Sequence, residues 1–146
     1  MAETTIKMEF EGYWRDVNSG GIPSASGVYS VYAATHDARE KTVDLKRLLY
    51  IGEAADVGDR IRNHERRADW TRQLRTGEVL CFAIGRVAST IRNRAEAALI
   101  FKHQPPLNTS CTEEFKYDRT TMSLSGQCAL LTTYFTVERT HRAAWR

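Results

Sequence analysis

The stretch LLYIGEAADVGDRIRNH, from Leu48 to His64, predicts a strand followed directly by a helix. Its first four residues are apolar and stop at Gly52, and the helix is expected over about 57–67. Tyr50 stands at the end of the strand, and Arg60 and His64 are four residues apart, so they would share one helix face. The stretch therefore predicts an aromatic hydroxyl, a permanent cation and a titratable imidazole on one side of the molecule.

The surrounding sequence supplies partners for this strand. GVYSVYAA, from Gly27, is rich in β-branched and aromatic residues and predicts an antiparallel partner that carries Tyr29. The polar stretch 35–46 between them is expected to be a long hairpin loop that could also lengthen both strands. VLCFAIGRV (79–87) predicts a third, central strand. A helix then follows, with Ser89 or Thr90 as its cap, and ends before two prolines at 105–106.

GVY at 27–29 and YIG at 50–52, followed in order by Arg60, His64, Glu96 and Asn108, resemble the pattern of the GIY-YIG nuclease family. The resemblance covers residues 27–108, and the connection from GVY to YIG is longer than in compact members. It implies an α/β (α+β) fold in which helices flank a central three-stranded antiparallel sheet. Residues 1–26 and 109–146 would then be additions to this core within a single domain, 1–146.

The resemblance also implies an activity, which is the hydrolysis of phosphodiester bonds in DNA with Mg²⁺ or Mn²⁺. Glu96 would hold the metal and Arg60 would stabilise the pentavalent phosphate. Tyr29, Tyr50 or His64 would take the proton of the attacking water, and the sequence leaves that choice open. A free tyrosine has a pKa of about 10, so it needs nearby positive charge to act as a base near neutrality. Asn108 would orient the site by hydrogen bonding.

Glu96 has two interpretations from the sequence itself. It stands four residues after Arg92, so the pair could form a surface salt bridge on one helix. It is also a single carboxylate beside an apolar helix face, and Mg²⁺ needs only one or two protein carboxylates when water and phosphate complete its octahedron. One glutamate is thus chemically sufficient for a metal site.

Positive charge is concentrated in residues 57–94, which hold nine arginines and no lysine against four acidic residues. Arginine often decorates exposed helices, but its planar fork also suits phosphate. The expected partner is therefore DNA, with RNA not excluded. The residues predicted to contact it are Arg62, Arg66, Arg67 and Arg92. A non-catalytic nucleic-acid-binding module on the same fold is the alternative function.

The remaining sequence adds few constraints. IKMEF near the N-terminus alternates apolar and polar residues as a strand does, and residues around Ser125-Gly126 predict one or two further strands that cover an edge or complete a dimer surface. No apolar run approaches the roughly 20 residues that a membrane span needs. Three widely spaced cysteines predict reduced thiols in a cytoplasmic protein. The oligomeric state is not predicted.

Overall fold

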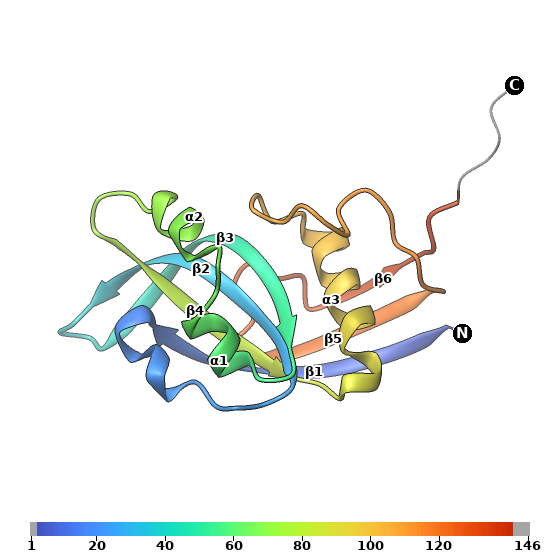
Figure 1. The fold of residues 1–146 in the computed structure, drawn as a ribbon, viewed down its shortest axis with the longest axis horizontal. Helices are drawn as coiled ribbons and strands as arrows, with labels where there is room; N and C mark the ends of the chain where they lie inside the picture. The colour runs from blue at the N-terminus through green and yellow to red at the C-terminus, as the bar shows by residue number, and fades with distance from the viewer. Residues whose placement is uncertain (1–2, 142–146) are drawn as a thin grey trace, which may run out of the picture.

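A computed structural model describes residues 3–141 (Figure 1). The outer ends of both predicted additions, residues 1–2 and 142–146, lie outside this range. The described elements follow one another as β1 (Thr4–Arg15), η1 (Asp16–Gly21), β2 (Gly27–Asp37), β3 (Thr42–Ala54), α1 (Val57–Arg62), α2 (Arg67–Arg72), β4 (Glu78–Arg86), α3 (Ser89–His103), β5 (Thr120–Gly126) and β6 (Tyr134–Val137).

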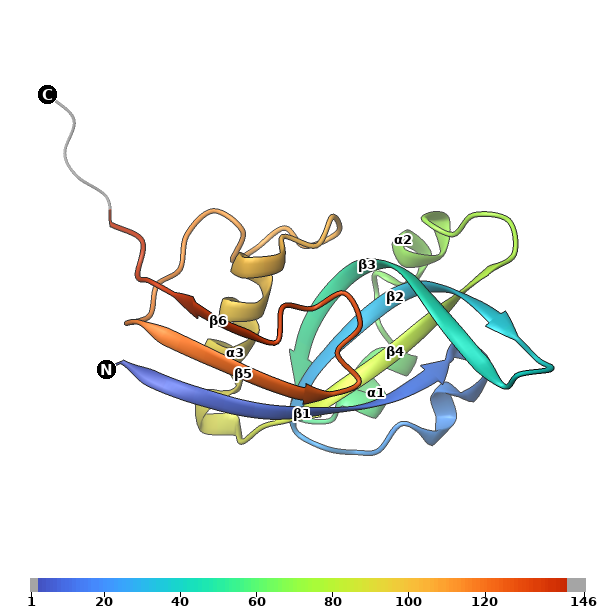
Figure 2. The same cartoon turned by 180° about the vertical axis from the view of Figure 1, so that it is seen from behind.

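These strands form one curled six-stranded sheet in the order β3-β2-β4-β1-β5-β6 (Figures 1 and 2). The expectation of a three-stranded central sheet is therefore corrected. β3, β2 and β4 are the expected antiparallel set, but β1 continues the sheet from β4, and β5 and β6 follow. β1 runs antiparallel to β4 and parallel to β5. Both additions join the sheet because their alternating apolar residues need a buried face.

The hairpin of β2 and β3 is longer than predicted, because most of the polar stretch 35–46 forms paired strands and not a loop. Paired residues continue from Gly27↔Ala54 to Asp37↔Thr42, so the loop shrinks to residues 38–41. The charged residues of this stretch lie on the exposed part of a twisted ribbon, where strand pairing satisfies the backbone and the side chains remain in water. The alternative of two lengthened strands is the one observed.

Two apolar clusters fill the interior, one on each side of β2. Val28 and Tyr32 belong to the first cluster, which includes the apolar face of α3 and the buried residues of β1 and β5. Tyr29 and Val31 belong to the second, which α1 and α2 cover. Successive side chains of a strand point to opposite faces, so this alternation follows from the strand itself.

The helices differ from prediction at their ends. α1 stops at Arg62, because Asn63 leaves the helical conformation, and His64 therefore lies in the turn before α2 rather than on the same helix as Arg60. A second short helix, α2, ends at Arg72, and Gly77, with a positive φ of 81°, belongs to the turn before β4. Neither Ser89 nor Thr90 caps α3, since its N-cap is Ala88 and makes no side-chain cap bond.

No helix between residues 3 and 141 combines the length and the apolar character that crossing a membrane requires.

Gly52 leaves space for the Tyr29 ring where β2 pairs with β3. Tyr29 lies directly opposite Gly52 in the hairpin, and a Cβ built on Gly52 would overlap the Tyr29 hydroxyl and ring. Tyr29 is only 1% exposed and packs within the second apolar cluster. The hydrogen side chain of Gly52 is therefore the condition for the buried position of Tyr29.

Replacing Gly52 by alanine should destabilise the protein. The added methyl group must displace the Tyr29 ring or the strand, and overpacking of this kind costs about 1–3 kcal/mol. The free energy of unfolding in urea measures the effect. Gly20→Ala is the matched control, because a Cβ at Gly20 meets nothing within 4 Å. Equal stabilities of the two variants would contradict the close approach.

Candidate active site

Four aromatic rings meet where β3 ends and α1 leads into α2. The ring centroids of Tyr29 and Tyr50 lie 6.3 Å apart, and His64 stands edge-on to both, at 6.2 Å from Tyr29 and 5.4 Å from Tyr50. Trp70 of α2 packs on His64 at 4.5 Å and on Tyr50 at 5.6 Å. Three of the predicted site residues are thus in contact, although they come from three separate segments.

Arg60 brings its positive charge to this cluster. Its guanidinium lies next to the Tyr29 hydroxyl, where its charge and hydrogen bonding lower the pKa of that group. Its terminal nitrogens donate to both carboxylate oxygens of Glu65, at 2.7 and 3.0 Å. The Arg60 side chain is 39% exposed and that of Glu65 is 65% exposed, so solvent reaches the pair. Arg60 therefore contacts the buried tyrosine on one side and a removable anion on the other.

His64 is held as a neutral imidazole. Burial, and secondarily the charge of Arg60, lower its pKa to about 4. Its Nδ1 accepts the backbone N–H of Arg66 at 2.9 Å, which places the ring proton on Nε2. Nε2 is buried and has no hydrogen-bond partner within residues 3–141. His64 thus presents one unused N–H donor within the aromatic cluster.

The two tyrosines are held as neutral phenols. Burial is the main cause that raises the pKa of Tyr29, and the neighbouring Tyr50 adds to it, while Arg60 opposes the rise. Burial also raises the pKa of Tyr50, with the charge of Glu96 as the second cause. The positive charge near Tyr29 is therefore too weak, in the protein alone, to make it a phenolate near neutrality.

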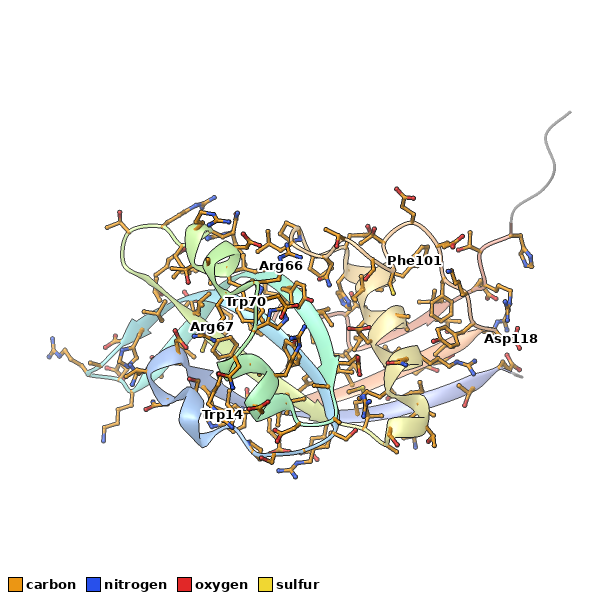
Figure 3. The ribbon with its side chains drawn as sticks, viewed as in Figure 1. Trp14, Arg66, Arg67, Trp70, Phe101 and Asp118 are labelled. Carbon is orange, nitrogen blue, oxygen red and sulfur yellow. The ribbon has the colours of Figure 1, made fainter. Side chains whose placement is uncertain are left out.

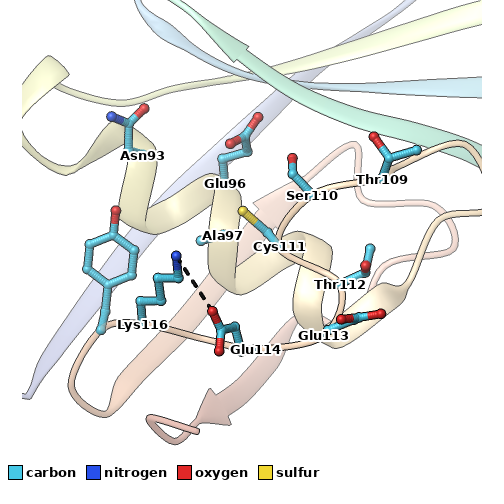
Figure 4. A pocket seen from close by; sticks show the side chains of 11 residues that line it. Asn93, Glu96, Ala97, Thr109, Ser110, Cys111, Thr112, Glu113, Glu114 and Lys116 are labelled. Atoms are coloured by element: carbon cyan, nitrogen blue, oxygen red, sulfur yellow. Dashed lines mark ion pairs between the residues drawn. The ribbon is translucent and has the colours of Figure 1, made fainter.

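Glu96 projects from α3 toward β3 (Figure 4). Its negative charge contributes to raising the pKa values of Tyr29 and Tyr50. Burial, and secondarily the carboxylate of Glu53, raise the pKa of Glu96 itself to about 7. Its other side borders a pocket of about 470 Å³ between α3 and residues 109–117. Glu96 is thus a half-buried carboxyl that remains accessible from this pocket.

The salt bridge expected between Arg92 and Glu96 is absent from the described part of the chain. Arg92 instead donates from Nε to Glu53 at 2.5 Å and from Nη1 to the Ser26 hydroxyl at 2.9 Å. The helix places Arg92 one turn from Glu96, but Glu53, directly after YIG, is the better-placed partner. Glu96 is therefore left without an ion pair among residues 3–141.

Asn108 joins the loop after α3 to the edge of the sheet. Its Nδ2 donates to the carbonyl oxygen of Ile51 at 2.8 Å, and its Oδ1 accepts the Ile51 N–H at 2.9 Å. The backbone N–H of Leu107 donates to the Leu49 carbonyl at 3.1 Å. The loop thus pairs with β3 as a short added strand would, one residue away from Tyr50 and Gly52.

The four arginines predicted to contact nucleic acid all have partners inside the fold. Arg62 donates to the carbonyls of residues 19 and 22, which anchors η1 to α1. Arg66 donates to Asp69 and to a loop carbonyl and lies 5.9 Å from the Tyr50 ring, and Arg67 pairs with Asp16 beside Trp70 (Figure 3). With Arg92 paired to Glu53, these side chains hold segments together, and their contact with nucleic acid stays a prediction.

Three residues in or beside this site were not predicted from the sequence. Glu53 and Glu65 carry the carboxylates next to Glu96 and Arg60, and Trp70 supports the His64 ring. Glu53 directly follows YIG and Glu65 directly follows His64, so adjacency to the motif residues was an available signal. Trp70 had no such signal, because its contact depends on how α2 folds back.

The donor set suits a hard cation only in part. No group of three or more His, Cys, Asp or Glu side chains within residues 3–141 could enclose a metal ion. Glu96, however, is a half-buried carboxyl that lacks an ion pair among the described residues and borders an open pocket, with Glu53 as a second carboxylate nearby. Mg²⁺ bound through one or two carboxylates, with water and phosphate as the other ligands, fits these residues.

Comparison with known proteins finds a likeness to UvrABC system protein C of Haloarcula marismortui, at 30% identity over 101 residues. The matched region is 68% of this chain but only 16% of that relative. No family model matches the chain, and no solved structure matches it.

The raised pKa of Glu96 should make stability depend on pH. The folded protein keeps this proton up to about pH 7, whereas the unfolded chain releases it near the ordinary value of 4.5. Glu96 therefore lowers the free energy of unfolding progressively as pH rises from about 4.5 to 7, and no further above that. In EDTA, Glu96→Gln should become more stable relative to the parent by about 1–3 kcal/mol across this range. His64 titrates in both proteins, so its contribution cancels from the difference in free energy of unfolding between them. A difference that stays constant from pH 4.5 to 7 would contradict the burial of the Glu96 carboxyl.

Proposed function

We propose that the chain is a GIY-YIG-type endonuclease that hydrolyses phosphodiester bonds in DNA with a divalent cation. The observation that carries the proposal is the meeting of Tyr29, Tyr50, His64 and Arg60 at the end of β3, within electrostatic reach of a lone half-buried Glu96. Such hydrolysis needs a positioned water, a cation at the phosphate and stabilisation of the leaving oxygen. The likeness to UvrABC system protein C supports a DNA-directed role.

Glu96 would hold Mg²⁺ or Mn²⁺, with Glu53 close enough to share the charge. A bound divalent cation supplies Lewis-acid stabilisation of the developing negative charge on the leaving oxygen. In the free protein Glu96 holds a proton up to about pH 7, so metal binding displaces that proton in the neutral range. The open pocket beside Glu96 lets a phosphate and water reach it.

Arg60 would contact the phosphate that is attacked. Its planar guanidinium already binds a two-oxygen anion, the Glu65 carboxylate, and a phosphate has the same bidentate geometry to offer. Because Glu65 is the more exposed partner, it can swing into solvent while Arg60 stays against Tyr29. Glu65 would thus hold the Arg60 guanidinium in place until a substrate phosphate replaces the Glu65 carboxylate.

Tyr29 would position the attacking water rather than ionise first. Its phenol is neutral, and its oxygen can accept a hydrogen bond from water while Arg60 stands beside it. His64, with Nδ1 occupied by a backbone N–H, acts as a donor through Nε2 and not as the base in this arrangement. As the oxygen of this water bonds to phosphorus and the bond to the leaving oxygen breaks, the proton of the water would pass to solvent or to a phosphate oxygen, while Tyr29 and Arg60 fix the position of the water.

The alternative is a binding module on the same fold that does not cut. A binder gains nothing from a carboxyl facing phosphate, since like charges repel. The placement of Glu96 near both tyrosines without an ion pair among the described residues favours catalysis. Cleavage of supercoiled plasmid with Mg²⁺ or Mn²⁺, against EDTA, separates the two functions.

Glu96→Gln should abolish metal-dependent cleavage while leaving DNA binding as tight as in the parent, or tighter. The amide keeps the shape of the side chain but removes the charge that holds the cation and repels phosphate. Arg60→Ala should lose cleavage and some affinity together, because a cation at the phosphate stabilises both the bound state and the transition state. Plasmid cleavage and fluorescence anisotropy measure the two effects. Near-parental cleavage by Glu96→Gln would exclude the assigned metal site.

Glu65→Gln should bind DNA more tightly than the parent at low salt. The substitution removes the anion that competes with phosphate for the Arg60 guanidinium. The gain should depend on Arg60, so Arg60→Ala/Glu65→Gln should bind no better than Arg60→Ala alone. Glu9→Gln, which removes an exposed acid of β1, is the control for net charge. An equal gain in the control would show a general charge effect.

A further inference from the structure

Few cations among residues 3–141 lack an internal partner. Most described lysines and arginines make an ion pair, a side-chain hydrogen bond or an aromatic contact, as those of the 57–94 segment do except for Arg75. The exceptions among residues 3–141 are Lys7, Arg15, Arg39, Lys41 and Arg75. These side chains keep their full charge for an external anion.

Two of these free cations line one cleft. Arg15, at the end of β1, and Lys41, in the β2–β3 loop, border a cavity of about 850 Å³ together with His36, Asn18 and Gln127. No aspartate or glutamate of the described chain lines it. Asp37, on the same hairpin, accepts hydrogen bonds from the backbone N–H groups of residues 39 and 40, so its charge is directed into the turn.

The cleft lies away from the candidate active site. Tyr13 and Val43, which also line it, pack against the first apolar cluster, whereas Tyr29 belongs to the second, on the other side of β2. The β2–β3 loop and the end of β1 also stand at the end of the molecule opposite α3 (Figures 1 and 2). Its walls come from β1, η1, the hairpin end and the turn after β5. The lengthened hairpin and both additions thus meet here.

We propose that this cleft is a second phosphate-binding surface, which holds a nucleic-acid strand separate from the one at Tyr29 and Glu96. Arg15 supplies a bidentate fork, Lys41 a point charge, and His36, Asn18 and Gln127 supply further hydrogen-bonding groups for phosphate and sugar oxygens. The choice of nucleic acid over another polyanion rests on the proposed function. The presence of unpaired positive charges in the cleft does not depend on that function.

The location can be tested by a titration of the whole ¹⁵N-labelled chain with a short single-stranded DNA and with a short duplex, in EDTA so that nothing is cut. Amide shifts should move at residues 15–18, 36–42 and 127 as one group, separately from those at 50–66. Shifts confined to 50–66 would overturn the second surface and leave the nuclease proposal intact. If the chain cuts no DNA in the separate plasmid assay with Mg²⁺ or Mn²⁺ but shifts are still present at the cleft, the nuclease proposal is overturned and the second surface stands.

The charges are tested by Arg15→Ala/Lys41→Ala against Lys7→Ala/Arg75→Ala, which removes two equally unpaired cations outside the cleft. The cleft variant should bind more weakly, and its slope of log affinity against log salt on duplex should fall by about 1.8, as expected for two lost phosphate contacts. The control should keep the parental slope. Equal losses in both variants, or equally tight binding of poly-glutamate with the same dependence on Arg15 and Lys41, would overturn the proposal.

Discussion

The paired hydrogen bonds between Asn108 and Ile51 hold the two halves of this protein in register. α1 and α2 pack on one side of β2, while α3 packs on the other side against Val28 and Ile51, so the Tyr29 ring and the helix of Glu96 lie on different faces of the sheet. The Asn108 amide bonds both polar groups of the Ile51 backbone and so ties the end of α3 to the strand that carries Tyr50. Each bond contributes about 1 kcal/mol, but their greater effect is to set where the helix lies along the strand.

Arginine has two different uses in this fold. Arg62, Arg66 and Arg67 donate to backbone carbonyls and carboxylates and so join short segments that have too little apolar surface to pack alone. α1 and α2 are only six residues each, and isolated helices of that length are unstable in water. Arg60 differs because its partner is an exposed side chain rather than a carbonyl. Arg62, Arg66 and Arg67 are thus mainly structural, whereas the ion pair of Arg60 is open to exchange with another anion.

Burial sets the protonation states of the site before any ligand arrives. It keeps both tyrosines as phenols, keeps His64 neutral and leaves Glu96 protonated up to about pH 7. Of the predicted catalytic side chains in the free protein, only Arg60 is then charged, although Glu53 and Arg66 bring further charges close to them. A cation and a phosphate arriving together would add opposite charges to a region of low dielectric, where their mutual attraction is strong. This arrangement favours binding both over binding either alone.

The sequence by itself determined the strands that carry Tyr29 and Tyr50, the central strand β4, the helix that carries Glu96 and the strands of both additions, because apolar periodicity and Pro or Gly breaks are local properties of the chain. It did not determine that α1 ends before His64, that Arg92 pairs with Glu53, or that the sheet has six strands. Those outcomes depend on partners far away in sequence. A helix end is set by what the next segment packs against, and a cation takes whichever anion the fold brings nearest. Only the tertiary structure could decide them.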